Sequence, residues 1–151
     1  MSTSGEIEIA KLWLPVIFTL VGWFFVNHQN KRIADRKEAR EAADRCKQLC
    51  RSAASEAISY LNSSRKEAKK SLQRVKEHLD ELEVEVNRLP LYQGKSPLVH
   101  RLAIFNRFIM SIDEAREELD EMEILELESK IRINRTNLLL EIEKQFKVHY
   151  C

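Results

Sequence analysis

The sequence predicts an all-α protein in which a single N-terminal transmembrane helix continues into a cytoplasmic antiparallel helical hairpin or coiled coil. Three observations predict this class. The 151 residues include only 3 Gly and 3 Pro, and 32% of them are charged, a composition typical of long helices. Residues 12–26 contain no charged side chain. Apolar residues recur at heptad spacing over residues 68–89, as they do in a coiled coil.

The uncharged stretch reads LWLPVIFTLVGWFFV. As a helix it covers about 22 Å, less than the ~30 Å hydrocarbon core of a bilayer. The predicted transmembrane helix therefore begins earlier and covers residues 7–26, after a short extracytoplasmic tail at residues 1–6. Trp13 and Trp23 lie close to its ends, where aromatic rings favour the membrane interface. Pro15 lies in the first turns, where its missing N–H is tolerated. These three residues are the predicted membrane-anchor residues.

The charges on either side of this stretch predict its orientation. The N-terminal side has only Lys11 as a basic residue, whereas residues 27–46 contain Lys31, Arg32, Arg36, Lys37, Arg40 and Arg45. Because basic flanks stay in the cytoplasm, we expect the N-terminus outside and residues 27–151 inside, with membrane lipid as one partner.

The segment GWFFVNHQNKRIADRKEAR, which contains the end of the apolar stretch and the residues after it, resembles the membrane exit of uncharacterised short single-pass bacterial inner-membrane proteins. The resemblance covers roughly the first 40 residues and includes no chemical motif. It implies the bacterial inner membrane as the location, and it implies no activity.

The first cytoplasmic helix is expected over residues 27–88, because no Pro or Gly interrupts them. Its apolar residues alternate at spacings of four and three between residues 68 and 89, which predicts a packed seam. The predicted seam positions are Leu72, Val75, Leu79, Leu82 and Val86. Residues 62–64, Asn-Ser-Ser, are the weakest point of this helix and the place where a bend is expected.

A loop is expected over residues 89–97, which contain two Pro and one Gly. A second helix then covers residues 98–149 and returns antiparallel to the first. Its apolar pattern is regular at first and changes phase near residue 115. Phe105, Phe108, Ile109 and Ile112 are predicted interaction positions because they exceed what one two-helix seam covers.

Charge complementarity supports a specific register of this hairpin. If Arg88 faces Leu98, the acidic residues 113–128 lie beside the basic residues 58–73. This register pairs Arg65 with Glu121 and Lys69 with Glu117, and it brings residues 146–151 beside residues 35–40. Exposed pairs of this kind contribute only a few tenths of a kcal/mol each, so they select the register more than they stabilise it.

No residue pattern predicts a catalytic, cofactor or metal site, and we expect no enzyme activity. Cys46 and Cys50 share a helix face but lack two further ligands nearby, so they are predicted to be buried small side chains. Cys151 has no residues after it and does not form a prenylation box.

Acidic residues alternate with the basic ones in residues 27–76, where Tyr60 is the only aromatic residue, which argues against nucleic acid as a partner. No small-molecule substrate is evident.

The predicted function is a membrane-anchored helical scaffold or adaptor that oligomerises or holds a protein partner at the cytoplasmic face. The uncovered apolar positions favour a homo-oligomer or a helical protein partner. The alternative is an oligomeric membrane-disrupting or pore-forming effector. The apolar stretch has Thr19 as its only polar side chain apart from the Trp rings, and such a stretch would line a water-filled pore poorly.

Overall fold

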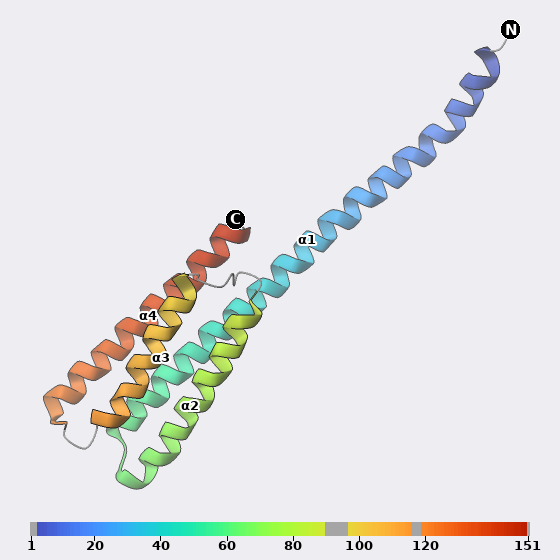
Figure 1. Ribbon diagram of the computed structural model, residues 1–151. Helices are drawn as coiled ribbons and strands as arrows, with labels where there is room; N and C mark the ends of the chain where they lie inside the picture. The colour runs from blue at the N-terminus through green and yellow to red at the C-terminus, as the bar shows by residue number, and fades with distance from the viewer. Residues whose placement is uncertain (1–2, 90–96, 116–118, 151) are drawn as a thin grey trace. The chain divides into compact units, whose positions relative to one another are not determined.

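The computed structural model describes residues 3–89, 97–115 and 119–150, and the side chains of residues 13–64, 67–89, 97–113 and 119–150. These residues form four helices, and no strand occurs among them (Figure 1), so the predicted all-α class is confirmed. The helices are α1 (Thr3–Asn62), α2 (Arg65–Arg88), α3 (Pro97–Ala115) and α4 (Glu121–Tyr150). The chain divides into two compact units, Met1–Glu38 and Ala39–Cys151.

The first unit contains the N-terminal part of α1. Its large apolar side chains at residues 13–26 are between 45% and 70% exposed. Pro15 lies inside the helix, and the hydroxyl of Thr19 donates a hydrogen bond to the Pro15 carbonyl at 2.8 Å. Among the described residues, a Cβ at Gly22 would meet nothing within 4 Å apart from its own helix neighbours.

Across the residues that the structure describes, none of the helices combines the length and the apolar character needed to cross a membrane. The predicted transmembrane helix over residues 7–26 is therefore wrong, as is the predicted single-pass inner-membrane location. The uncharged residues 12–26 form only about 22 Å of helix, and the extension to residue 7 that would lengthen it takes in the charged residues Glu8 and Lys11. Lys11 precedes them and four polar residues, 27–30, follow them. Trp13, Pro15 and Trp23 consequently lose their predicted role as membrane anchors.

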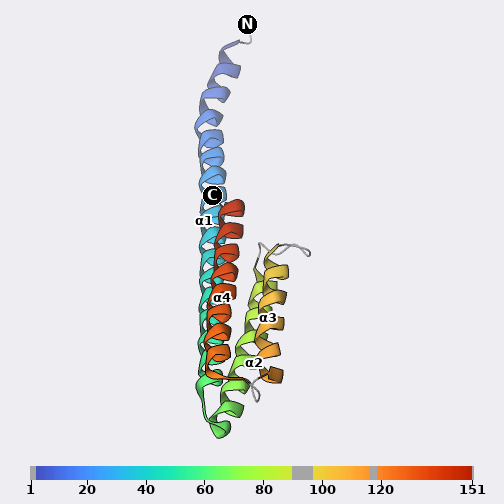
Figure 2. The same cartoon turned by 90° about the vertical axis from the view of Figure 1, so that its left-hand side faces the viewer.

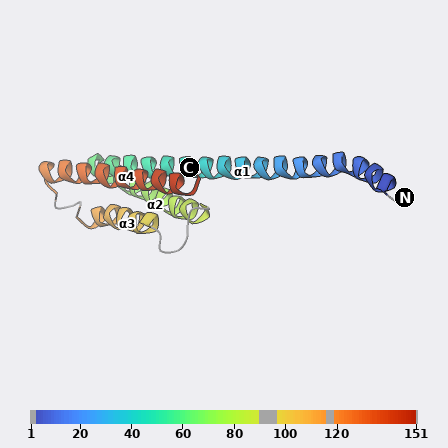
Figure 3. The same cartoon turned by 90° about the horizontal axis from the view of Figure 1, so that it is seen from above.

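The second unit is a four-helix bundle formed by residues 39–62 of α1 together with α2, α3 and α4. Successive helices run antiparallel, and Figures 2 and 3 show α4 beside α1 and α3 beside α2. The bundle core contains residues from every helix. Alternating helices with a shared apolar core are the usual arrangement of such bundles.

The bundle differs from the predicted hairpin because each long predicted helix is divided in two. The first division lies at Ser63 and Ser64. Ser63 donates its hydroxyl to the Tyr60 carbonyl at 3.1 Å, and Ser64 is extended, with φ −61° and ψ 159°. The Ser64 hydroxyl donates to the Glu67 carboxylate at 3.1 Å, and the Ser64 carbonyl accepts the Glu67 N–H at 3.0 Å. Short hydroxyl side chains compete with the helical backbone in this way, so α1 ends and α2 begins here.

The second division precedes α4. The Glu123 N–H donates to the Asp120 carboxylate at 2.8 Å, and the Asp120 N–H donates to the Glu123 carboxylate at 2.9 Å. This reciprocal pair is a capping box, which stabilises the start of a helix. Residues 116–118 lie outside the described residues, as do residues 90–96 of the predicted loop.

The helices contribute side chains of different size to the core. The buried positions of α1 are mostly small and include Ala39, Ala43, Cys46, Cys50, Ala53, Ala54 and Ala57. The other helices contribute mainly larger residues, among them Leu82, Phe105 and Leu138, all fully buried. Small residues on one helix allow close approach by its neighbours, and the larger side chains supply most of the apolar area removed from water.

Candidate functional site

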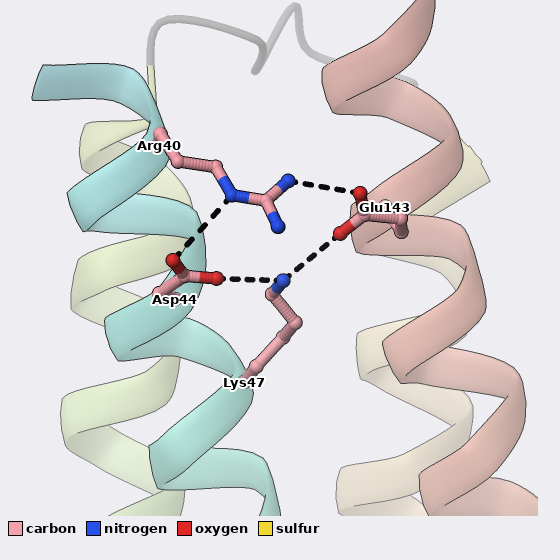
Figure 4. Close-up of polar contacts among 4 residues, drawn as sticks. All are labelled: Arg40, Asp44, Lys47 and Glu143. Carbon is pink, nitrogen blue, oxygen red and sulfur yellow. Dashed lines mark hydrogen bonds and ion pairs between the residues drawn. The ribbon is translucent and has the colours of Figure 1, made fainter. Parts of the chain in front are cut away.

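Four charged side chains of α1 and α4 form a closed cluster in the bundle, shown in Figure 4. The Arg40 guanidinium lies 2.8 Å from Glu143 and 3.4 Å from Asp44. The Lys47 ammonium lies 2.7 Å from Asp44 and 2.9 Å from Glu143. Each cation therefore contacts both anions, and each anion contacts both cations. Arg40, Asp44 and Lys47 follow one another at helical spacings of four and three, which places them on one face of α1.

The cluster holds its charges strongly. Hydrogen bonds from Arg40 and then Lys47 lower the pKa of the Glu143 carboxyl from 4.5 to about 2. The hydrogen bond to Glu143 raises the pKa of the Arg40 guanidinium above its usual value. Because the four charges neutralise one another, the cluster is suited to joining α1 to α4 rather than to binding an ion. Among the described residues no group of His, Cys, Asp or Glu side chains is arranged to hold a metal.

We expect Glu143→Gln to destabilise the bundle by about 1–2 kcal/mol at neutral pH, since it removes two charge-assisted hydrogen bonds at a partly exposed site. The folded pKa of Glu143 lies below its usual value, so its contribution is present above pH about 4.5 and is lost as the pH falls toward about 2. Urea unfolding at a series of pH values measures the difference between the two proteins. That difference should shrink steadily below pH about 4.5.

The matched control is Glu126→Gln. Glu126 pairs with Lys130 at 2.7 Å within α4, and both side chains are at least half exposed. A pair of this kind contributes about 0.3–0.5 kcal/mol. If the two variants lost equal stability, or if the Glu143→Gln loss were the same at every pH, the proposed role of the cluster would be wrong.

Aromatic side chains adjoin the cluster. The Arg40 guanidinium lies over the Phe146 ring, 5.0 Å from its centre, and Phe146 stacks on Tyr150 with ring centres 5.3 Å apart. A cation over an aromatic face is attracted by the ring quadrupole. The contact also places Phe146 beside Arg40, which is the pairing that the predicted register implies for these two positions.

The two described cysteines are inert in this fold. Cys46 and Cys50 are fully buried and not disulfide-bonded. Burial raises the pKa of both thiols to about 12, so they remain protonated at neutral pH and are poor nucleophiles and poor metal ligands. The Cys50 thiol lies 4.0 Å from the Arg135 carbonyl as a weak donor. Cys151 lies outside the described residues.

A shallow surface depression of about 570 Å³ lies between α1 and α2. The Glu85 carboxylate on its wall lies 3.5 Å from Arg45 and 3.4 Å from Arg88. These charges pair with one another instead of converging on a ligand. The depression therefore lacks the polar arrangement that is typical of small-molecule sites.

The structure places the predicted interaction positions inside the bundle. Leu72 and Phe108 are half-buried. The other predicted positions are at most 4% exposed, namely Val75, Leu79, Leu82, Val86, Phe105, Ile109 and Ile112. Helices of the same chain therefore cover Phe105, Ile109 and Ile112, for which we expected cover from a second molecule.

The described residues do not test the two predicted charge pairs. Glu117 lies outside them, as does the side chain of Arg65, while Lys69 and Glu121 are exposed. The pairs Lys69–Glu117 and Arg65–Glu121 stay predictions. The basic partners from another helix that the structure shows for α4 are Arg40 and Lys47 on α1, whereas the predicted partners Arg65 and Lys69 belong to α2.

The sequence analysis did not predict two features of the structure. The first is the charge cluster, whose signal was the spacing of Arg40, Asp44 and Lys47 on α1. The second is a set of exposed apolar residues on α4, namely Met122, Leu125, Ile133, Leu140 and Val148. Its signal was the change of phase after residue 115, because α4 is apolar on two faces and a single ladder cannot describe it.

Comparison of the chain with protein-family models, with curated proteins and with solved structures finds no match in any of the three. The function must therefore be inferred from the surfaces that the described residues present.

Proposed function

We propose that the protein is a non-enzymatic helical scaffold or adaptor, in which residues 13–26 of α1 dock into a helical protein partner. The single observation that carries the proposal is the exposure of this apolar segment. Each of its large apolar side chains is between 45% and 70% exposed. Soluble chains rarely leave a contiguous apolar surface of this size uncovered, and such surfaces usually mark interaction sites.

The distribution of these side chains indicates the kind of partner. Apolar residues occupy almost every position from 13 to 26, so they face all sides of the helix. A helix that is apolar all round is buried on all sides. A flat protein surface or a single groove would cover only one side. The partner is therefore expected to surround the segment with several helices.

The composition of the segment supports a protein interface. Trp13, Phe18, Trp23, Phe24 and Phe25 are aromatic and exposed. Large aromatic residues dominate the binding energy of protein interfaces, because they bury much area at low entropic cost.

The second unit supports the scaffold role because it has its own core. Residues from each of its helices are fully buried within it, so the bundle does not need the docking of residues 13–26 for its packing. Its thiols are buried and protonated, and the charges of the cluster are paired. The proposal accordingly includes no chemical step.

The test is affinity purification of the tagged full chain from cells that naturally make it, with the triple variant Phe18→Ser, Val21→Ser and Phe25→Ser alongside. We expect a stoichiometric protein to co-purify with the native chain and to be lost with the variant. A photo-crosslinking residue at position 21 should attach to helical segments of that protein. The matched control is Val84→Ser, which removes an exposed apolar side chain of α2 and should retain the partner.

Two results would contradict the proposal. One is a set of co-purifying proteins that the triple variant leaves unchanged. The other is recovery of the native chain with lipid alone, without a stoichiometric protein. Circular dichroism of the triple variant should show an unchanged unfolding transition of the bundle, which separates loss of docking from loss of folding.

A further inference from the structure

Two stretches of the bundle contain basic residues and no acidic ones. They are residues 45–55 of α1, with Arg45, Lys47 and Arg51, and residues 129–140 of α4, with Lys130, Arg132 and Arg135. The whole chain has 25 Lys and Arg against 24 Asp and Glu, so both stretches depart from an otherwise balanced composition. Each stretch is therefore a local excess of positive charge.

The antiparallel packing of α1 and α4 brings the two stretches together. The Lys47 ammonium donates a hydrogen bond to the Glu143 carboxylate at 2.9 Å. The Cys50 thiol lies 4.0 Å from the Arg135 carbonyl. Both contacts join the first stretch to the second or to the turn that follows it, so the two basic stretches lie side by side.

Four of these six cations have a carboxylate partner from outside the two stretches. The pairs are Arg45–Glu85 at 3.5 Å, Lys47–Glu143 at 2.9 Å, Lys130–Glu126 at 2.7 Å and Arg132–Glu128 at 3.5 Å. Among the side chains that the structure describes, none forms an ion pair or a hydrogen bond with the guanidinium of Arg51 or of Arg135. Two positive charges of the seam between α1 and α4 therefore lack an anion.

Arg135 occupies a core position of α4. It lies one turn from both Ile131 and Leu138, which are fully buried, at spacings that place the three residues on one face. The Arg135 Nε is shielded from water and has no hydrogen-bond partner, whereas the terminal nitrogens of the guanidinium are not shielded in this way. A charge held partly out of water interacts more strongly with a counter-ion than a charge on an open surface.

Arg51 approaches the same place from α1. Burial raises the pKa of the Cys50 thiol to about 12, and the charges of Arg135 and Arg51 act in the opposite direction. Both guanidinium groups are therefore close to this thiol. Arg51 is exposed, and none of the residues three or four positions from it is acidic. Two arginines from two helices thus converge beside Cys50 without a carboxylate between them.

We propose that Arg51 and Arg135 bind a phosphate group in the seam between α1 and α4. A phosphate group carries about −1.5 to −2 charges at pH 7 and three acceptor oxygens, so it balances two guanidinium groups and accepts hydrogen bonds from both. A carboxylate has a single charge and two oxygens, and it would leave one of the two cations unbalanced. Arginine binds phosphate through paired N–H donors, which lysine lacks.

The site is separate from residues 13–26 and does not rest on the function proposed for them. The test measures the binding of inorganic phosphate to the full chain by phosphorus NMR at constant ionic strength, and we expect saturable binding of a single phosphate. Arg51→Gln and Arg135→Gln should each weaken binding about ten-fold or more, which is the loss expected from one charge-assisted hydrogen bond.

Two controls separate binding from folding and from general attraction of anions. Arg51 is exposed, so Arg51→Gln should leave the unfolding transition of the bundle unchanged, and it tests the site even if Arg135→Gln alters the core. Arg107→Gln is the matched control, because it removes an exposed arginine of α3 and should leave phosphate binding unchanged.

Phosphoserine identifies the source of the phosphate group. Tighter binding of phosphoserine than of inorganic phosphate would point to a phosphorylated protein, and equal or weaker binding would point to free phosphate. Phosphoserine binding should weaken below pH about 6, where the group loses its second charge. The proposal is wrong if the native chain binds no phosphate at millimolar concentrations, or if acetate displaces phosphate as effectively as phosphate itself. It is also wrong if Arg107→Gln reduces binding as much as Arg51→Gln.

Discussion

Leu82→Asp is expected to remove the cooperative unfolding transition of the bundle, or to lower its stability by more than about 4 kcal/mol. Leu82 is fully buried among the core residues. An aspartate at this position would bury a charge without a partner and would also leave part of the Leu volume empty. Small domains have a total stability of about 5–15 kcal/mol, so this one substitution removes a large share of it. Circular dichroism during heating and urea titration measures the effect.

Exposed neighbours on the same helix provide the controls. Glu81 and Glu83 are exposed on either side of Leu82, and replacing either by Ala should change the stability by no more than about 0.5 kcal/mol. Similar transitions for all three variants would contradict the burial of Leu82. Leu79→Asp, at a side chain 4% exposed, should reproduce the Leu82→Asp result.

The heptad pattern predicted burial well wherever a helix has only one apolar face. On α2, Val75, Leu79, Leu82 and Val86 are at most 4% exposed, as their spacing indicates. The opening ladder of α3 behaves in the same way. In both segments the polar residues between the apolar ones leave a single orientation that removes the apolar side chains from water.

The break at Ser63 and Ser64 falls within residues 62–64, where a bend was expected, whereas the break before α4 was not predicted. The sequence signals of both breaks are short. Ser64 and Glu67 have the spacing of a capping box, and so do Asp120 and Glu123. Neither pair is accompanied by Pro or Gly. Without such a breaker, the sequence alone does not distinguish a cap from a polar pair within a continuous helix. The two breaks turn the predicted hairpin into a bundle, and they explain why its interaction positions are covered from within.

Helix α4 shows a second limit of the prediction. Met122 belongs to the part of the second predicted helix where the apolar pattern has changed phase, and it is 75% exposed. Apolar residues on two opposite faces give overlapping periodicities, and only the packing of α1 and α3 decides which face is buried. The charge cluster was missed for a related reason, because Glu143 approaches Arg40 and Lys47 only after the helices pack.

Phe105→Ala is expected to destabilise the bundle by about 3–5 kcal/mol, because the ring is fully buried and its loss combines a transfer term with a cavity. Phe108→Ala is the matched control, since it makes the same chemical change one turn later on α3 at a half-buried side chain. Both substitutions change helix propensity equally, so the difference between them reports burial. Urea titration should show a lower midpoint for Phe105→Ala with an unchanged slope, and less than half that loss for Phe108→Ala. Equal losses would mean that both rings are covered to the same extent and would contradict the arrangement of α3 in the bundle.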